Sequence, residues 1–303
     1  MSSTISNDFD LLKKPENCYE TAIFSRAIHN HSIHLIGFEF DGTACYRKGT
    51  RLAPDDIRRQ SPGIESYSPY LHQDLEDILS LIDLGNLPVG ESADVEVNWQ
   101  KATDYFFKMT EKINFEQNHI RFLTLGGEHS ISYAPIVRYL QQYPDLVLIH
   151  LDAHADLRDG YEGYHYSHAA IIRRIIEKMT NSQQLIQYGI RSGIREEFQW
   201  MQDNHTRMES LDLFIDTIKS IADNRPIYLS LDLDYFDPCY LPGTGTPEPG
   251  GEDFHSFIRL NKILAKKNFV GADVVELAPN IDATGNSSVF ATTIVRELLL
   301  SLS

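Results

Sequence analysis

Three short clusters of acidic residues and histidines follow apolar stretches of the sequence. They occupy residues 126–130, 152–156 and 232–238, and a single acid, Glu276, ends a fourth apolar stretch. Carboxylates and imidazoles at such positions can bind metal ions or transfer protons. If the apolar stretches are strands of an open α/β sheet, ligands bind beyond their carboxyl ends. We therefore expect all four positions to face one crevice.

The spacing inside the clusters favours metal binding. Residues i, i+2 and i+4 of an extended chain project to the same side, about 6–7 Å apart at each step. The residues that project together in this way are Asp152, His154 and Asp156 in one cluster and Asp232 and Asp234 in another. Carboxylates crowded into one crevice repel one another strongly unless cations neutralise them. A metal centre removes that conflict.

With His129 from the first cluster, the candidate ligands number six. They are His129, Asp152, His154, Asp156, Asp232 and Asp234. Two imidazoles and four carboxylates form an oxygen-rich set that suits Mn²⁺ better than a tetrahedral thiolate zinc site. Six side chains exceed what one metal takes from protein while keeping an open position. We therefore expect two Mn²⁺ ions that share Asp152 and Asp232, so that four carboxylates balance two divalent cations.

Each position also has a simpler structural interpretation. The Asp152–Asp156 cluster alone could be a polar turn, and His129 alone could be a core histidine. His168 could start a helix, and Glu276 could be a surface acid at a strand end. Asp237, which precedes Pro238, is expected to anchor a loop rather than to bind metal. Residues 243–251 lack both the Gly-x-Gly-x-x-Gly pattern and a Lys-Ser/Thr ending, which excludes a nucleotide-phosphate loop.

The segments that must position these residues alternate between strand and helix patterns. Apolar runs predict strands at 34–38, 122–125, 146–151, 185–190, 227–231 and 269–275. Helical patterns occupy residues 97–118, 169–176, 252–267 and 286–301. Several runs lack polar alternation, as in strands buried on both faces of a parallel sheet. The sequence predicts one α/β domain over residues 31–303, with residues 1–30 as a loosely attached N-terminal extension.

Composition narrows the function classes. The chain has 303 residues, 42% of them hydrophobic, and its 27 basic and 43 acidic side chains give a net charge of −16. This acidity disfavours nucleic acid or an anionic membrane as a partner and is compatible with a small cationic substrate. No apolar run approaches the roughly 18 residues of a membrane span. Three separated cysteines suggest free thiols in a reducing compartment, so we expect a cytoplasmic protein.

The clusters and their order resemble the ureohydrolase family of arginases and agmatinases, most closely its agmatinase branch. The matching segments are 49–58, 126–130, 152–156, 166–169, 189–192, 232–238, 243–251 and 273–276. The resemblance runs from about residue 37 to residue 297. It implies a three-layer α/β/α, arginase-like fold with a mostly parallel central sheet, in a single domain. It also implies a homo-oligomer, a trimer or a hexamer.

The resemblance assigns roles to individual residues. One manganese ion would be bound by His129, Asp152, Asp156 and Asp232, and the other by Asp152, His154, Asp232 and Asp234. His168 matches the family's proton-shuttling histidine, and Glu276 matches the glutamate that binds the guanidinium. Glu128 departs from the family, where many members have aspartate. We expect little effect, since this position is not a ligand.

The function that follows is manganese-dependent hydrolysis of a guanidino group, with agmatine and water giving putrescine and urea in polyamine biosynthesis. Asp156 and His168 would carry protons. Glu248, together with Asp159 and Glu162 in a loop that lacks the asparagine of arginases, would attract the terminal ammonium of agmatine. We expect Arg158 to form an outward salt bridge. The alternatives are arginine, guanidinobutyrate, aminopropylagmatine or formiminoglutamate as substrate, or a catalytically silent metal-binding homologue.

Overall fold

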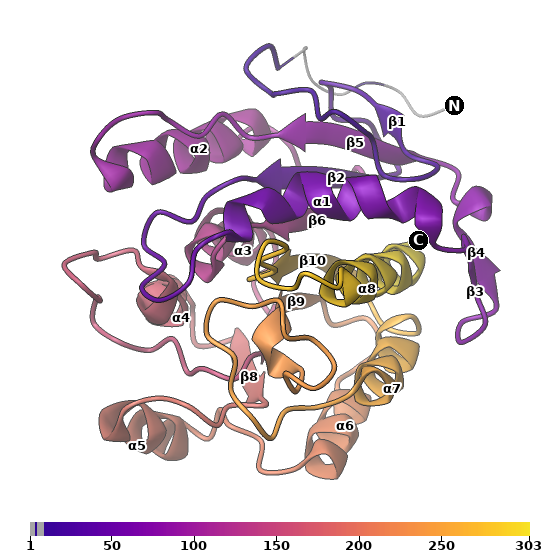
Figure 1. Ribbon diagram of the computed structural model, residues 1–303. Helices are drawn as coiled ribbons and strands as arrows, with labels where there is room; N and C mark the ends of the chain where they lie inside the picture. Colours follow the sequence, from indigo (N-terminus) through magenta and orange to yellow (C-terminus); the bar gives the residue numbers. More distant parts are fainter. Residues whose placement is uncertain (1–3, 5–8) are drawn as a thin grey trace.

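The computed structural model describes residue 4 and residues 9–303, and its centre is one eight-stranded sheet in which every pairing is parallel (Figure 1). In spatial order the strands are β1 (Ile23–Phe24), β5 (Leu81–Asn86), β2 (Ser32–Phe38), β6 (Ile120–Gly126), β10 (Phe269–Val275), β9 (Ile227–Asp232), β7 (Val147–Leu151) and β8 (Gln184–Tyr188). All six strands predicted from the sequence are present. A separate hairpin pairs β3 (Tyr67–Ser68) with β4 (Gln73–Asp74).

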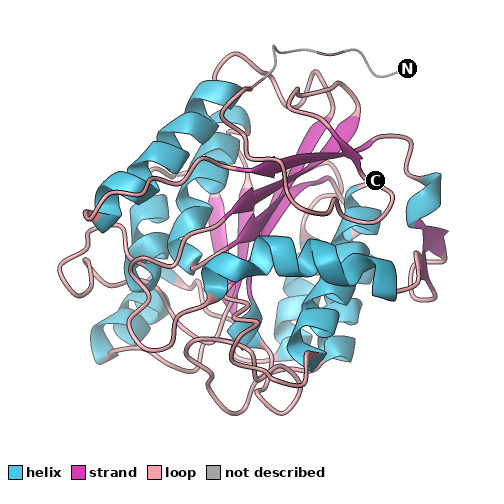
Figure 2. Ribbon diagram, turned by 45° about the horizontal axis from the view of Figure 1, so that its top comes forward, coloured by secondary structure: helices cyan, strands magenta, loops and turns pink. Residues whose placement is uncertain are grey.

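Helices cover both faces of the sheet, which confirms the predicted three layers (Figure 2). One face packs against α1 (Ala53–Gln60), α6 (Leu211–Ser220), α7 (Phe254–Leu264) and α8 (Asn286–Leu302). The other packs against α2 (Val95–Thr110), α3 (Tyr133–Gln142), α4 (Ile171–Ile176) and α5 (Arg195–Asn204). Short 3₁₀ helices lie at Thr50–Leu52, Ser61–Gly63, Leu75–Asp77, His129–Ser132, His168–Ala170 and Leu233–Tyr235. Across the described residues, every helix is too short or too polar to cross a bilayer.

The register of the central strands brings the polar clusters together. Val274 of β10 pairs with Leu125 of β6, and Val275 pairs with Asp232 of β9. Leu151 of β7 pairs with Leu231 of β9. These four neighbouring strands therefore end at nearly the same level. The segments that follow them, 126–130, 152–156, 232–238 and Glu276, start side by side at one edge of the sheet.

Strand β5 was not predicted, because polar residues interrupt its apolar pattern. Asp83 and Asn86 are buried, and both are bound by the fully buried guanidinium of Arg58 in α1. Arg58 Nε donates to Asp83 Oδ2 at 2.8 Å, and Arg58 Nη2 donates to Asp83 Oδ1 at 3.0 Å. This bidentate pair compensates the buried charges and fixes α1 against the sheet.

Part of the segment 9–30 packs against the sheet. β1 pairs with β5 at the sheet edge, and Tyr19 and Ile28 are buried. The backbone N–H of Tyr19 donates to Asp83 Oδ2 at 3.1 Å. Residues 1–3 and 5–8 of the expected extension lie outside the described residues. The division of the chain at residue 31 stays a prediction.

Candidate metal centre and active site

Nδ1 of His129 lies among three aspartates at the end of the sheet. It is 3.0 Å from Asp152 Oδ2, 3.0 Å from Asp156 Oδ2 and 3.3 Å from Asp232 Oδ2. Among the described residues this buried nitrogen has no hydrogen-bond partner. We call His129, Asp156 and the Oδ2 atoms of Asp152 and Asp232 the His129 lobe. The donor atoms of His129, Asp152 and Asp156, with that of His150, are close enough together to bind one metal ion, and Asp232 Oδ2 lies beside them.

A second group of donors, the His154 lobe, lies beside the first. His154 Nδ1 is 2.8 Å from Asp234 Oδ2 and 3.6 Å from Asp152 Oδ1. Asp152 thus directs one carboxylate oxygen into each lobe, and its Oδ1 also accepts the backbone N–H of His154 at 2.5 Å. Asp232 contributes Oδ2 to the His129 lobe, whereas its Oδ1 accepts the backbone N–H of Asp234 at 2.8 Å. The structure therefore brings all six predicted ligands together, while bridging by Asp152 and Asp232 stays a prediction.

The electrostatics of the cluster fit bound cations. Burial, together with the charges of Asp234 and Asp152, raises the pKa of Asp232 well above its ordinary value. Burial and the charge of Asp152 raise the pKa of Asp156 to about 7. Burial would lower the pKa of His129, but its three aspartate neighbours raise it well above the usual value. A proton at His129 therefore relieves the crowding, and a metal ion would take its place.

The buried carboxylate of Asp273 orients His129 through the hydroxyl of Ser230. His129 Nε2 lies 3.0 Å from Ser230 Oγ, and the Ser230 hydroxyl donates to Asp273 Oδ1 at 2.7 Å. Asp273 also accepts hydrogen bonds from Ser132 and Tyr228. Since the serine hydrogen is given to Asp273, Ser230 accepts the Nε2–H of His129. Nδ1 is then the nitrogen that faces the aspartates, which is the arrangement that a metal ligand needs.

His150 is a member of the cluster that the sequence analysis missed. Its Nε2 lies 2.8 Å from Asp152 Oδ2, and its Nδ1 lies 3.1 Å from the side-chain amide nitrogen of Gln187. Because that amide donates to Nδ1, the His150 Nε2–H donates to Asp152. His150 thus orients Asp152 rather than supplying a lone pair to a metal. It stands two residues before Asp152 in strand β7, and this spacing could have identified it.

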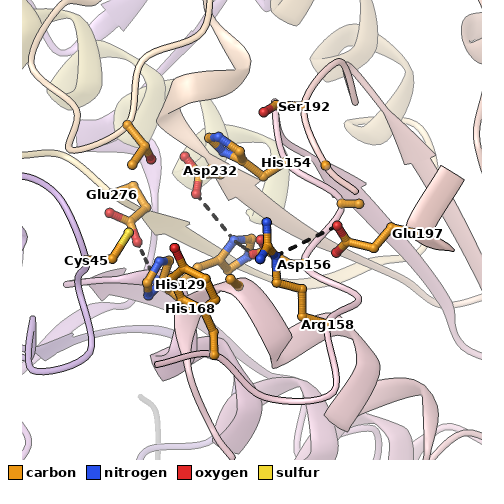
Figure 3. A pocket seen from close by; sticks show the side chains of 15 residues that line it. Cys45, His129, His154, Asp156, Arg158, His168, Ser192, Glu197, Asp232 and Glu276 are labelled. Carbon is orange, nitrogen blue, oxygen red and sulfur yellow. Dashed lines mark hydrogen bonds and ion pairs between the residues drawn. The ribbon is translucent and has the colours of Figure 1, made fainter. Parts of the chain in front are cut away.

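The centre opens into a cavity of about 240 Å³ whose wall also contains His168 and Glu276 (Figure 3). Glu276 Oε1 accepts the backbone N–H of His129 at 2.7 Å. Burial and the charge of Glu128 raise the pKa of Glu276 well above its usual value. Asp156 and Glu276 both have positive φ, 55° and 67°, a conformation that costs non-glycine residues about 1–3 kcal/mol. Two of the eight described non-glycine residues with positive φ therefore lie at the site.

The residues expected near the far end of the substrate are only partly brought together. Glu248 Oε1 accepts the hydroxyl of Ser192, a cavity residue, at 2.9 Å and lies 3.9 Å from His154 Nε2. Asp159 instead lines a neighbouring cavity and accepts from Arg174 Nη2 at 2.7 Å. Its expected contact with substrate is wrong, because the Arg174 guanidinium holds it outside the catalytic cavity.

The expectation that Arg158 points outward is also wrong. Arg158 lines the catalytic cavity, where its guanidinium stacks 4.7 Å from the centre of the Tyr161 ring. Its Nε lies 4.0 Å from Glu197 Oε2, and Figure 3 shows this pair in the cavity wall. Glu197 is held there by the backbone N–H groups of Leu157 and Ile194. The ion pair exists as expected, but it faces the cavity.

Asp237 anchors a loop, as the sequence predicts. Its Oδ1 accepts the backbone N–H of Cys239 at 2.9 Å, and its Oδ2 accepts that of Gly250 at 2.7 Å. Hydrogen bonds from the side chain and backbone of Cys239, and from the backbone of Gly250, lower the pKa of Asp237 to about 2. The carboxylate therefore closes the loop between residues 237 and 250 beside the metal cluster.

Comparison with known proteins agrees with this geometry. Residues 31–301 match the Arginase family. The chain belongs to the arginase family. It is 36% identical to an agmatinase of Bacillus subtilis (strain 168), over 88% of this chain and 90% of that one. It is 33% identical to an agmatinase of Bacillus anthracis, over 94% and 98% of the two chains.

The fold comparison gives the same family. The crystal structure of a putative agmatinase from Clostridium difficile superposes with a TM-score of 0.81 at 37% identity, covering 90% of this chain and 98% of that one. The predicted α/β/α architecture and the resemblance to arginases and agmatinases are thereby confirmed.

Because Asp152 directs one oxygen into each lobe, Asp152→Asn is predicted to lower the content of both metal ions. Asp234→Asn, which changes the His154 lobe alone, should lose about one ion per chain. Elemental analysis of the purified, dialysed variants measures this. Asp237→Asn is the matched control, since it removes a neighbouring loop carboxylate and should keep two ions. Equal metal content in the Asp152 and Asp234 variants would contradict the bridging geometry.

Proposed function

We propose that this protein hydrolyses agmatine with water to urea and putrescine, at a centre of two Mn²⁺ ions. The observation that carries the proposal is the opening of both ligand lobes into one cavity that also contains Glu276 and His168. The agmatinase names of several relatives support the choice of substrate. The oxygen-rich donor set supports manganese.

Glu276 would bind the guanidinium of the substrate. A guanidinium stays protonated at neutral pH and presents a planar array of N–H donors. Glu276 Oε1 already accepts the His129 N–H, which fixes the carboxylate and leaves Oε2 for the substrate. A charge-assisted hydrogen bond from a guanidinium N–H to Oε2 would hold the guanidinium carbon against the two lobes.

Two bound divalent cations would supply a hydroxide nucleophile at neutral pH. Departure of the amine product requires a proton, and Asp156 and His168 lie in the cavity wall where they can carry it. Burial, with the positive charges of His154 and His129, lowers the pKa of His168 to about 4. At neutral pH the resting imidazole is therefore uncharged, with one nitrogen that carries hydrogen and one that does not.

The far end of the cavity would select the terminal ammonium of agmatine. The Glu248 carboxylate is held by the Ser192 hydroxyl and remains 38% exposed, so it can face a cation. The charge of Arg158 is offset by Glu197 and by the face of Tyr161. Glu248, which lies 3.9 Å from His154 Nε2, then supplies negative charge beside the cavity.

Arg158 also favours a second candidate, guanidinobutyrate, whose terminal carboxylate could pair with its guanidinium in place of Glu197. The long 4.0 Å separation of Arg158 and Glu197 makes that exchange feasible. The carboxylates of arginine and formiminoglutamate could pair with Arg158 in the same way.

We predict that kcat/KM for agmatine exceeds that for arginine and for guanidinobutyrate by at least ~10-fold, because Glu248 attracts the ammonium and repels a carboxylate. Urea release with Mn²⁺ present measures all three substrates. Glu248→Gln should reduce the ratio of kcat/KM for agmatine to that for the other two substrates. Asp216→Asn, at an exposed position on α6, should leave this ratio unchanged. A preference for guanidinobutyrate would reject agmatine while keeping the ureohydrolase chemistry.

Glu276→Gln is predicted to keep two metal ions per chain and to lower kcat/KM roughly 10- to 100-fold, since it weakens one charge-assisted hydrogen bond to the substrate. Its backbone conformation and its hydrogen bond to His129 can be retained by the isosteric amide. Metal analysis and steady-state kinetics are run on the same sample. Loss of a metal ion in this variant would show that Glu276 is a ligand instead.

We also propose that the protein works in the cytoplasm as a homo-oligomer, a trimer or a hexamer. Cys18, Cys45 and Cys239 are free thiols, as in a reducing compartment. Large apolar side chains on the surface, such as Leu79 and Tyr46, offer area for subunit contacts. Sedimentation analysis of the full chain measures the oligomer.

A further inference from the structure

Glu128 is a fully buried acid that neither the metal centre nor the proposed mechanism uses. It directly precedes His129. Burial raises its pKa to about 7, although hydrogen bonds from Thr43, Ser130 and the backbone of Ala44 favour the ionised carboxylate that accepts them. Thr43 N donates to Oε2 at 2.8 Å, the Thr43 hydroxyl donates to Oε1 over a short contact, and the Ser130 hydroxyl donates to Oε1 at 2.7 Å. Thr43 lies 85 residues earlier in the chain, in the loop that follows β2.

The hydroxyl of Thr43 connects Glu128 to His168. Thr43 Oγ1 accepts the backbone N–H of His168 at 3.2 Å and lies 3.3 Å from His168 Nδ1. A hydroxyl has one hydrogen to donate, and here Glu128 receives it. Thr43 Oγ1 can therefore only accept from the imidazole. The hydrogen between Thr43 and His168 belongs to Nδ1.

We propose that Glu128, acting through the Thr43 hydroxyl, is a positioning residue that holds His168 in the tautomer with hydrogen on Nδ1 and leaves Nε2 as the proton acceptor for the cavity. The proposal rests on the proposed hydrolytic function for its catalytic meaning. The tautomer itself can be tested without measuring catalysis.

The tautomer matters because His168 is a neutral imidazole in this cavity. A neutral imidazole has one N–H and one bare nitrogen, and the two are not interchangeable in proton transfer. With Nδ1–H fixed by Thr43, the bare nitrogen is Nε2, and the ring can take a proton there. The ring plane is also restricted, because Tyr161 packs edge to face at 5.8 Å and 90°.

A chain of the same kind orients His129. There the buried Asp273 receives the hydrogen of Ser230, which accepts Nε2–H of His129. Glu128, Thr43 and His168 form an equivalent chain of carboxylate, hydroxyl and imidazole. In each chain the buried carboxylate fixes the hydroxyl, and the hydroxyl fixes the imidazole. The two chains leave opposite ring nitrogens free, Nδ1 of the ligand His129 and Nε2 of His168.

Glu128→Gln gives a directional test. The glutamine side chain has one acceptor oxygen. The backbone N–H of Thr43 can only donate, so the glutamine oxygen must take the position that accepts it. The amide NH₂ then faces Thr43 Oγ1 and Ser130 Oγ. This releases the Thr43 hydroxyl hydrogen toward His168 Nδ1, and the imidazole should switch to the tautomer with hydrogen on Nε2.

The experiment records the imidazole ¹⁵N signals of histidine-labelled full-length protein, loaded with diamagnetic Zn²⁺ so that the signals are not broadened. His168→Asn assigns the residue. We expect hydrogen on Nδ1 in the wild-type protein and in the control Ser130→Ala, which removes another donor to Glu128. We expect hydrogen on Nε2 in Glu128→Gln. Hydrogen on Nε2 in the wild-type protein would overturn the proposal, and so would an unchanged tautomer in Glu128→Gln.

Kinetics give an independent readout on the Mn²⁺ enzyme. Thr43→Val removes the hydroxyl at nearly constant shape and should lower kcat roughly 10- to 100-fold with KM and metal content little changed. Thr43→Ser restores the hydroxyl and should restore most of kcat. Equal kcat in the valine and serine variants would overturn the role of the hydroxyl. If the protein does not hydrolyse agmatine but shows the expected tautomers, the proposed substrate fails and the positioning role stands.

Discussion

The structure depends on how it compensates a fully buried carboxylate, that of Asp152. This carboxylate lies between Asp156 and Asp232 of the His129 lobe and Asp234 of the His154 lobe. It is fully buried, and an uncompensated charge in such surroundings is very costly. His150 donates to one oxygen at 2.8 Å, and the backbone N–H of His154 donates to the other at 2.5 Å. Hydrogen bonds from histidines hold the pKa of Asp152 well below its usual value although burial alone would raise it. The same two oxygens point into the two lobes, so cations would complete the compensation.

The fold supplies this arrangement through the parallel sheet. Four neighbouring strands end at one level, so short segments after each strand can meet without long loops. Apolar helices on both faces keep the sheet dry and rigid behind the site. The buried carboxylates of Asp273 and Glu128 then determine which ring nitrogen carries the hydrogen in His129 and in His168. The positive φ angles of Asp156 and Glu276 are tolerated because the surrounding contacts determine them.

Much of this could be predicted from the sequence because local patterns carry it. Strands such as Val147–Leu151 are apolar apart from His150, and the alternation of Asp152, His154 and Asp156 is visible directly. Strand β5 was missed because Asp83 and Asn86 look like loop residues until Arg58 of α1 is placed beside them. The helix expected to reach residue 118 ends at Thr110, whose hydroxyl turns back to Phe106 O. Contacts between distant segments, such as Thr43 with Glu128 and Arg158 with Glu197, depend on tertiary packing and have no local signal.

We propose that two cations share the buried Asp152 and that hydrolysis requires both. Electron paramagnetic resonance during Mn²⁺ titration of chelated protein, with urea release measured on the same samples, tests it most directly. We expect the spectrum of two spin-coupled Mn²⁺ ions, with an intensity that grows in proportion to urea release. Full activity with only the six-line signal of isolated Mn²⁺ would contradict it.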